Sequence, residues 1–269
     1  MGATLLDVPL FDRMAQHSQA ALDRLFAHCE ADGACRQAFP DLEGTFRRLR
    51  ERLDDEPVPT YVTNPINGEK IMVTNEVLAT VVHNRLLDAR AAAELPRLLY
   101  RAHALEVWEP IARDYASYLE LGRDQLVMMR VIFCSEPWAA FSPRTALETG
   151  DGSYYLSTLL KNRTEIGAAC DVLHSSEPGA CYSPTRSSQV PVLFINGDSD
   201  PQDPPANVVG ASELWPRSLA LTLPNEGHVF TQWECVLAVI KDFLQQGTVE
   251  ELEMGCTRRL EPPAFSTRP

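Results

Sequence analysis

Apolar residues recur every three or four positions over most of the chain, which is the spacing of amphipathic helices. Residues 9–30 place Met14, Leu22 and Phe26 near one face, and a second helix is predicted over residues 39–53. Pro96 suits the first turn of a later helix. Further helical stripes lie at 77–86, 98–105, 111–121 and 126–133. Residues 1–185 are therefore predicted to be mainly helical.

Two stretches interrupt this helical pattern. Residues 57–74 contain several prolines and the pair Asn67-Gly68, which indicates a loop or a short hairpin. Gly150, Gly152 and the prolines within 178–191 break the pattern again. No internal repeat and no low-complexity segment is found in the sequence.

From about residue 190 the pattern changes to strands that alternate with helices. Strands are predicted at 190–195 and 218–223, and helices at 206–214 and 232–244, with Gly247 as a C-terminal cap. The two strands are apolar on both faces, which is typical of parallel strands joined by helical crossovers. Two strands cannot bury both faces by themselves. We therefore expect one face, with Val192 and Phe194 or their neighbours, to meet water.

The composition of the chain is that of a soluble protein of 269 residues with a net charge of −13. This charge argues against nucleic acid or an anionic membrane as the main partner. No apolar run is long enough for a membrane span, and the first residues have neither a signal peptide nor a myristoylation pattern.

Seven cysteines are many for a protein of this size. None of their spacings is that of a zinc site, and the histidines are scattered, so no metal site is predicted. Three disulfides with one free thiol are favoured, which implies an oxidising compartment. Reduced cysteines in the core are the alternative.

An acid and a histidine follow the two predicted strands. Asp200 stands in the stretch "INGDSDPQDPPAN" after the first strand, and His228 stands in "NEGHVF" after the second. Each alone has an ordinary explanation, because Asp-Pro segments commonly start turns and single histidines are commonly structural. Together, at two strand ends, they predict an acid and a base for catalysis.

The residues around this pair resemble a known family. The stretches "VPVLFINGDSDPQDPPANV", "PNEGHVF" and "CVLAVIKDFLQQGTVEELEMGC" resemble the C-terminal part of α/β-hydrolases of the tripeptidyl-aminopeptidase and prolyl-aminopeptidase group. "ALDRLFAHCEADGACRQAFPDLE" and "VIFCSEPW" resemble the helical cap of that group. The resemblance covers nearly the whole chain, but only the second half of a complete family member.

The resemblance implies an incomplete α/β-hydrolase fold in the α/β class. A helical cap at 1–185 would be followed at 186–269 by the last two strands and helices of the core sheet. In this family the triad runs serine, acid, histidine along the chain. Asp200 matches the acid and His228 the base, whereas Asp198 comes too early for the motif and Asp203 too late.

The nucleophile of such a triad is missing from the sequence. It should be a serine in G-x-S-x-G on a strand-to-helix turn. Gly152-Ser153 lacks the second glycine, and Ser199 lies on the acid loop itself. The few residues before the first helix leave no room for such a turn, so we expect a chain that carries two thirds of a triad.

Further residues have weaker functional interpretations. Glu136 resembles a cap acid that binds the free amino terminus of a peptide, or it is a solvated surface residue. Trp108, Trp138, Tyr154 and Tyr155 line a substrate pocket or, more simply, pack in the core.

The resemblance also implies how the cysteines pair. The disulfides would be Cys29–Cys35, Cys134–Cys170 and Cys235–Cys256, with Cys181 free. It implies a secreted or cell-envelope protein that needs no cofactor.

Two functions remain open at this point. The first is a serine hydrolase that releases short units from peptide N-termini or cleaves small esters or amides. Such a chain would be inactive alone and would pair with a separate half that bears the nucleophile. The second is a non-catalytic, cap-derived helical module that binds peptides or a partner protein. The sequence does not specify the side chains a substrate would carry, the oligomeric state or a role for Cys181.

Overall fold

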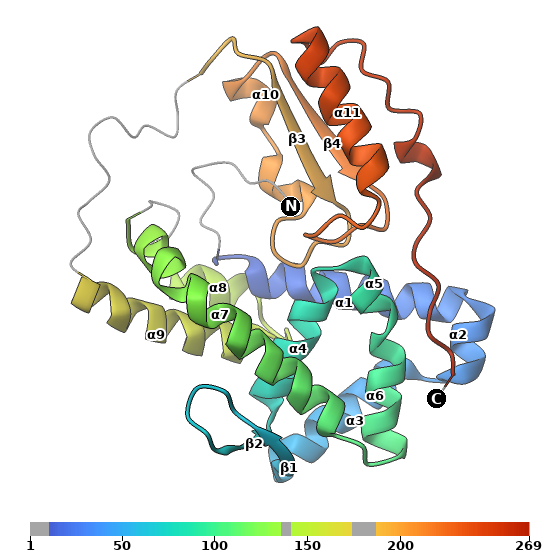
Figure 1. Ribbon diagram of the computed structural model, residues 1–269, viewed down its shortest axis with the longest axis vertical. Helices are drawn as coiled ribbons and strands as arrows, with labels where there is room; N and C mark the ends of the chain where they lie inside the picture. Colours follow the sequence, from blue (N-terminus) through green and yellow to red (C-terminus); the bar gives the residue numbers. More distant parts are fainter. Residues whose placement is uncertain (1–10, 136–140, 174–186, 269) are drawn as a thin grey trace.

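The computed structural model describes residues 11–135, 141–173 and 187–268 (Figure 1). These residues form a mixed α/β structure that is mostly helical and has two small sheets. In Figure 1 the helical part and the β3–β4 part lie one above the other, and the C-terminal segment runs from α11 back to the helices. The predicted boundary at residue 185 lies outside the described residues and stays a prediction.

The helical part contains one antiparallel hairpin, β1 (Val58–Thr63) with β2 (Lys70–Val73). Its helices are α1 (Met14–Ala31), α2 (Gly33–Ala38), α3 (Leu42–Asp55), α4 (Asn75–Leu86), α5 (Ala89–Ala93), α6 (Leu95–Ala104), α7 (Glu109–Ser135), α8 (Pro143–Thr149) and α9 (Leu156–Leu173). The hairpin was one of the two forms predicted for residues 57–74, and Gly68 sits in its turn with φ 78°. Pro96 lies in the first turn of α6, as predicted.

One continuous core holds these helices together. Leu22 of α1, Val82 of α4, Leu99 of α6 and Ile111 of α7 are all fully buried in it. They come from predicted helical stripes, so burial of one apolar face drives the assembly. The stripes predicted at 111–121 and 126–133 belong to the single helix α7 rather than to two helices.

The C-terminal part consists of β3 (Val192–Gly197), η2 (Pro205–Val208), α10 (Ala211–Leu214), β4 (Ser218–Leu223), α11 (Trp233–Gln246) and η3 (Thr257–Arg259). The two strands are parallel, as predicted, and pair in register from Val192↔Ser218 to Gly197↔Leu223. The single helix predicted at 206–214 is instead two short pieces. Gly210, with φ 87°, lies between them in a left-handed conformation that a helix excludes.

The expectation of a bare sheet face was wrong. Phe194 is only 9% exposed and packs with Val208, Ala211 and Trp215 from the η2–α10 side. On the other face, Ile195 packs with Val236 of α11. Figure 1 shows α10 and α11 on opposite sides of the strands. The η2–α10 crossover packs on one face of this narrow sheet and α11, which follows β4, packs on the other, while no described strand pairs with its two outer edges.

The helical part and the C-terminal part touch through polar backbone contacts as well as apolar ones. Val229 N–H donates to the Leu87 carbonyl at 2.7 Å, and Asp88 and Val229 form an isolated parallel bridge. The Arg90 guanidinium donates to the Thr231 carbonyl at 2.9 Å. Further along, Phe265 packs against the helical core. The loop that carries His228 is therefore attached to the end of α4 and the start of α5.

Candidate active site

The acid loop begins where β3 ends and folds back on itself at once. The Oδ1 atom of Asp200 accepts hydrogen bonds from the backbone N–H groups of Gln202 at 2.8 Å and Asp203 at 2.9 Å. An aspartate that binds the backbone two and three residues ahead forms a tight turn. Both of these hydrogen bonds use Oδ1, so Oδ2 of Asp200 can bind a group outside the acid loop. The Asp200 side chain is fully buried.

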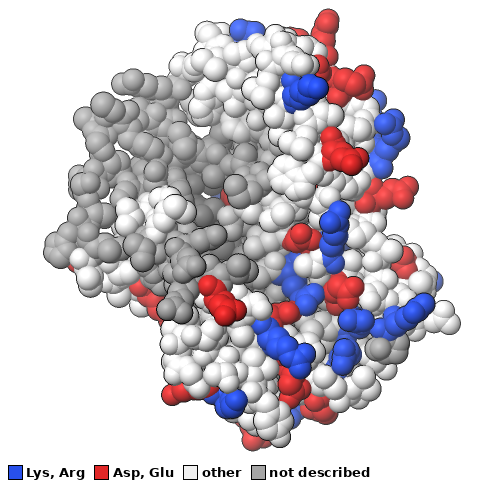
Figure 2. Space-filling view, in the orientation of Figure 1, with Lys and Arg blue, Asp and Glu red and all other residues white. Residues whose placement is uncertain are grey.

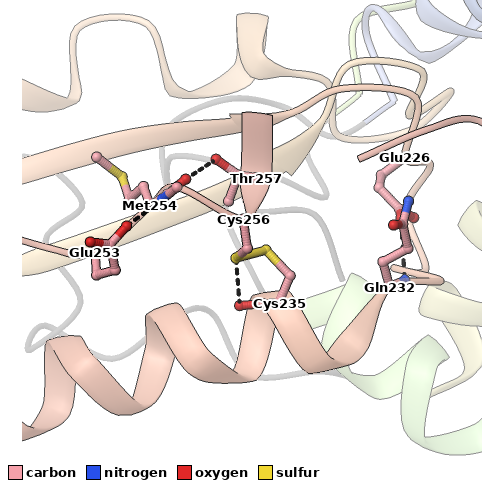
Figure 3. The surroundings of a disulfide bond; sticks show 8 residues. Glu226, Gln232, Cys235, Glu253, Met254, Cys256 and Thr257 are labelled. Carbon is pink, nitrogen blue, oxygen red and sulfur yellow. Dashed lines mark hydrogen bonds between the residues drawn. A yellow bond between two sulfur atoms is a disulfide. The ribbon is translucent and has the colours of Figure 1, made fainter. Parts of the chain in front are cut away.

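The histidine loop follows β4 and is fixed at both ends. Asn225 has a left-handed backbone with φ 60°, and its N–H donates to Asp198 Oδ1 at 2.9 Å. Glu226 is fully buried and accepts hydrogen bonds from Thr231 and from the Gln232 N–H, the latter drawn in Figure 3. The Glu226 carboxylate thus binds residues on the far side of His228, and these hydrogen bonds close the histidine loop.

The two loops bring Asp200 and His228 together. Nδ1 of His228 lies 3.0 Å from Oδ2 of Asp200, within hydrogen-bond distance. The His228 side chain is 15% exposed. Burial by itself lowers the pKa of His228, but the hydrogen bond and charge of Asp200, together with the charge of Asp203, outweigh it, so the pKa is raised above its usual value.

This geometry allows a defined chemistry. With the Nδ1 proton donated to Asp200, the other ring nitrogen, Nε2, is the one that can take a proton from a nucleophile. Asp200 would fix that tautomer and stabilise the imidazolium that forms. The catalytic roles of Asp200 and His228 stay predictions, but the sequence-predicted pair is in contact.

Three side chains of the helical part that lie against the acid loop were not predicted from the sequence. The Ser18 hydroxyl of α1 lies 2.8 Å from Nδ1 of His83 of α4 and 3.4 Å from the Pro201 carbonyl. His17 of α1 forms a backbone hydrogen bond with Gln202. Ser18 is separated from Pro201 by 183 positions, and no local pattern in the sequence signals so distant a contact.

His83 is buried, and its ring stacks on Tyr155 with centroids 4.2 Å apart. Burial lowers its pKa to about 4, against the smaller opposing effect of the Asp200 charge. Burial also lowers the pKa of His17. Both rings are therefore neutral around pH 7, and neither competes with His228 for the charge of Asp200.

The two neighbouring aspartates have different positions. Asp198 accepts from Ser199 and Asn225 and lies 3.7 Å from Arg24 of α1, so it joins the acid loop to the histidine loop and to the helical part. Asp203, which comes too late for the family motif, has Oδ2 at 3.6 Å from Nδ1 of His228. The turn at Asp200 explains this, because a residue three positions ahead returns to the same side.

The aromatic and acidic pocket candidates lie partly in the core and partly outside the described residues. Trp108, Tyr154 and Tyr155 are buried in the helical core, which is the simpler of their two interpretations. Glu136 and Trp138 lie outside the described residues. A role for Glu136 in binding a substrate therefore stays a prediction.

The structure contains the three disulfides that the resemblance implied, Cys29–Cys35, Cys134–Cys170 and Cys235–Cys256. Figure 3 shows the last of them joining α11 to the segment before η3. Three disulfides indicate an oxidising environment, as found outside the cell. Cys181 lies outside the described residues.

A small cavity lies behind the two loops, between α1, α5 and the C-terminal segment. Its volume is about 50 Å³, and Leu25, Ser199, Gly227 and Phe265 are among its lining residues. Such a space holds a water molecule or two rather than a peptide. Across the residues the structure describes, no group of three histidine, cysteine or carboxylate side chains is arranged to hold a metal ion.

The exposed surface carries charges of both signs. On the face in Figure 2, acidic and basic side chains are interspersed over the C-terminal and helical parts. None of the helices described has the combination of length and apolar character that crossing a membrane requires.

An acid and a histidine after neighbouring parallel strands, in this chain order, are the arrangement of the C-terminal part of an α/β-hydrolase. Residues 158–256 match the family model described as TAP-like protein, and this range contains both Asp200 and His228. This segment is thus the TAP-like C-terminal region of an α/β-hydrolase. No curated protein and no solved structure matches the chain.

Proposed function

We propose that this chain supplies the acid, Asp200, and the base, His228, of a serine-hydrolase triad. The observation that carries the proposal is the 3.0 Å contact between His228 Nδ1 and Asp200 Oδ2 at the ends of two paired parallel strands. Burial of the acid, a raised pKa for the histidine and the chain order support the same function.

The nucleophile comes from residues outside these 269, on the same polypeptide or on a separate half. No serine of the sequence stands in G-x-S-x-G. Within the described residues β3 pairs only with β4, which leaves its other edge for a further strand. The strand that carries the nucleophile would extend the sheet from that edge, and its serine would meet Nε2 of His228.

The substrate class is a peptide with a free amino terminus, from which the enzyme releases short units. A small ester or amide is a close variant. Glu136 would bind the terminal ammonium group, because a carboxylate beside an apolar pocket pairs well with it. The protein would act outside the cytosol, secreted or in the cell envelope, where its disulfides persist.

The test supplies the missing part. The chain is mixed with a separately expressed α/β-hydrolase segment that carries a strand, G-x-S-x-G and a helix, and hydrolysis of aminoacyl and tripeptidyl reporters is measured. We expect background rates for either part alone and a rate for the mixture that a serine-directed phosphonate abolishes.

Variants decide whether the proposed residues are responsible. His228→Ala and Asp200→Asn should each reduce the rate of the mixture by about 10³-fold or more. His103→Asn, which changes a histidine on α6 away from the site, is the matched control and should leave it unchanged. Full activity in His228→Ala would disprove the assignment. If no segment restores hydrolysis while the chain still binds peptides, the non-catalytic module becomes the better function.

A further inference from the structure

The carboxylate of Asp203 has no place in a triad of serine, acid and histidine. It is 5% exposed, and Oδ2 lies 3.6 Å from Nδ1 of His228, beyond a good hydrogen bond but within ion-pair distance. The Asp203 N–H donates to Asp200 Oδ1, so the same turn that holds Asp200 directs Asp203 towards the ring. His228 thus faces two carboxylates through one ring nitrogen.

The hydrogen bonds around Asp203 offset part of the cost of its burial. Its Oδ1 accepts from the Asn207 amide at 3.2 Å, its Oδ2 accepts from the Gln202 amide at 3.2 Å, and its carbonyl accepts from Asn196 at 2.8 Å. Buried carboxylates without such partners are costly. The protein therefore holds a second carboxyl group in this position and orientation.

The charges around the ring show what that group does. Burial and the charge of Asp200 raise the pKa of Asp203, while His228 lowers it. On α1 and α4, the neutral His17 and His83 lie near the loop and carry no positive charge, and the Arg24 guanidinium of α1 lies 3.7 Å from Asp198. Among the described residues, His228 is the side chain within ion-pair distance of both Asp200 and Asp203, so its imidazolium form is the one that both carboxylates favour.

We propose that Asp203 is a second carboxylate partner of His228, a positioning residue that holds the ring beside Asp200 and stabilises its imidazolium form. Its catalytic meaning rests on the proposed function, since it acts through His228. Without Asp203, the ring would keep its Nδ1 hydrogen bond to Asp200 but lose part of its affinity for the proton.

The test follows the His228 imidazole by NMR in the ¹⁵N-labelled 269-residue chain, with His228→Asn used to assign its signals. In Asp203→Asn we expect the pKa of His228 to fall by roughly one unit, with the Nδ1–H tautomer retained. In Asp200→Asn we expect a larger fall and loss of that tautomer preference. Asp198→Asn is the matched control, because Asp198 lies on the same loop but pairs with Arg24.

A fall in Asp203→Asn no larger than that in Asp198→Asn would overturn the proposal. If Asp203→Asn does not fold, the wild-type chain gives the answer through ¹³C signals of its carboxyl groups. The Asp203 carboxyl should then show an inflection at the midpoint of His228, and its absence would equally overturn the proposal. Neither readout requires hydrolysis, so a failure of the proposed enzyme activity remains distinguishable from a failure of this inference.

Discussion

The buried side chain of His83 should reduce the stability of this protein in mild acid. The folded chain lowers the pKa of His83 from 6.5 to about 4, chiefly because burial disfavours the charged ring. The unfolded chain then binds a proton below pH 6.5 that the folded chain refuses until about pH 4. The contribution of His83 to stability is therefore fully present above pH 6.5 and is lost as the pH falls towards 4.

The size of this loss follows from the two pKa values. A pKa difference of one unit corresponds to about 1.4 kcal/mol, so complete protonation of the unfolded chain costs the folded state about 3 kcal/mol. At pH 5 the same linkage gives about 2 kcal/mol. The neutral ring is held by Ser18 at 2.8 Å from Nδ1 and by the stack on Tyr155.

Other groups titrate in the same range, so a variant must isolate His83. The lowered pKa of His17 acts in the same direction, whereas the raised pKa values of His228 and Asp203 favour the folded state in acid. His83→Asn removes one of these contributions and keeps an acceptor near the position of Nδ1. Loss of the Tyr155 stack lowers the stability of this variant by a similar amount at both pH values.

The assay is equilibrium urea unfolding at about pH 7.5 and pH 5, followed by circular dichroism. Between these pH values, the wild-type chain should lose about 2 kcal/mol more unfolding free energy than His83→Asn. His103→Asn is the control and should lose as much as the wild type. Equal losses in the wild type and His83→Asn would show that His83 is not kept neutral by burial, and the reasoning would fail.

Three further predictions concern the loops, the disulfides and the surface. Gly197→Ala should destabilise the chain by about 1–3 kcal/mol in thermal melts and move the His228 NMR signal, because its Cβ would collide with the carbonyls of Glu226 and Gly227; an unchanged melt would contradict the close approach. Replacing each disulfide by two alanines should lower the free energy of unfolding in urea, and by more for a longer loop. The expected losses are about 2 kcal/mol for Cys29–Cys35, about 3 kcal/mol for Cys235–Cys256 and about 4 kcal/mol for Cys134–Cys170, whose loops span 6, 21 and 36 positions. The reverse order would refute the loop-closure explanation. The isolated chain should self-associate in light scattering through the edge of β3 that no described strand pairs and through the exposed residues Trp233, Leu237 and Leu244 of α11. The double change Leu237→Glu and Leu244→Glu should reduce the self-association, and a monomer at all concentrations would contradict the prediction.

The parts of the site that follow from sequence are those set by local pattern. The strand at 218–223 has the bounds that the sequence predicts, because an apolar run this short between polar turns has the length of a strand rather than of a helix. Gly247 ends α11 in a left-handed conformation, as a glycine at that position predicts. Asp200 and His228 were found because each directly follows such a strand, and carboxyl ends of parallel strands meet at one edge of a sheet.

The remaining parts depend on tertiary contacts that no local pattern encodes. Ser18 and His83 lie 65 positions apart and meet only because α1 packs on α4. Phe194 is buried because η2 and α10 pack on its face of the sheet. The apolar pattern of residues 206–214 predicts a helix but not which face of the sheet this helix covers. Asp203 was rejected on motif position alone, although the turn closed by Asp200 carries it towards the same ring.

The arrangement of these contacts explains how the Asp200–His228 pair keeps its geometry in a chain with only two described strands in this sheet. In the acid loop, the Pro201 carbonyl accepts a hydrogen bond from the Ser18 hydroxyl of the helical part. In the histidine loop, the Val229 N–H donates to the Leu87 carbonyl of the helical part. Both supports come from the α1 and α4 side, so neither depends on a further strand beside β3. Under the proposed function, a pair that is preorganised in this way would need no rearrangement when the nucleophile binds. The helical part therefore fixes the positions of Asp200 and His228, and under the proposed function a segment added at the edge of β3 that no described strand pairs would have only to place its serine.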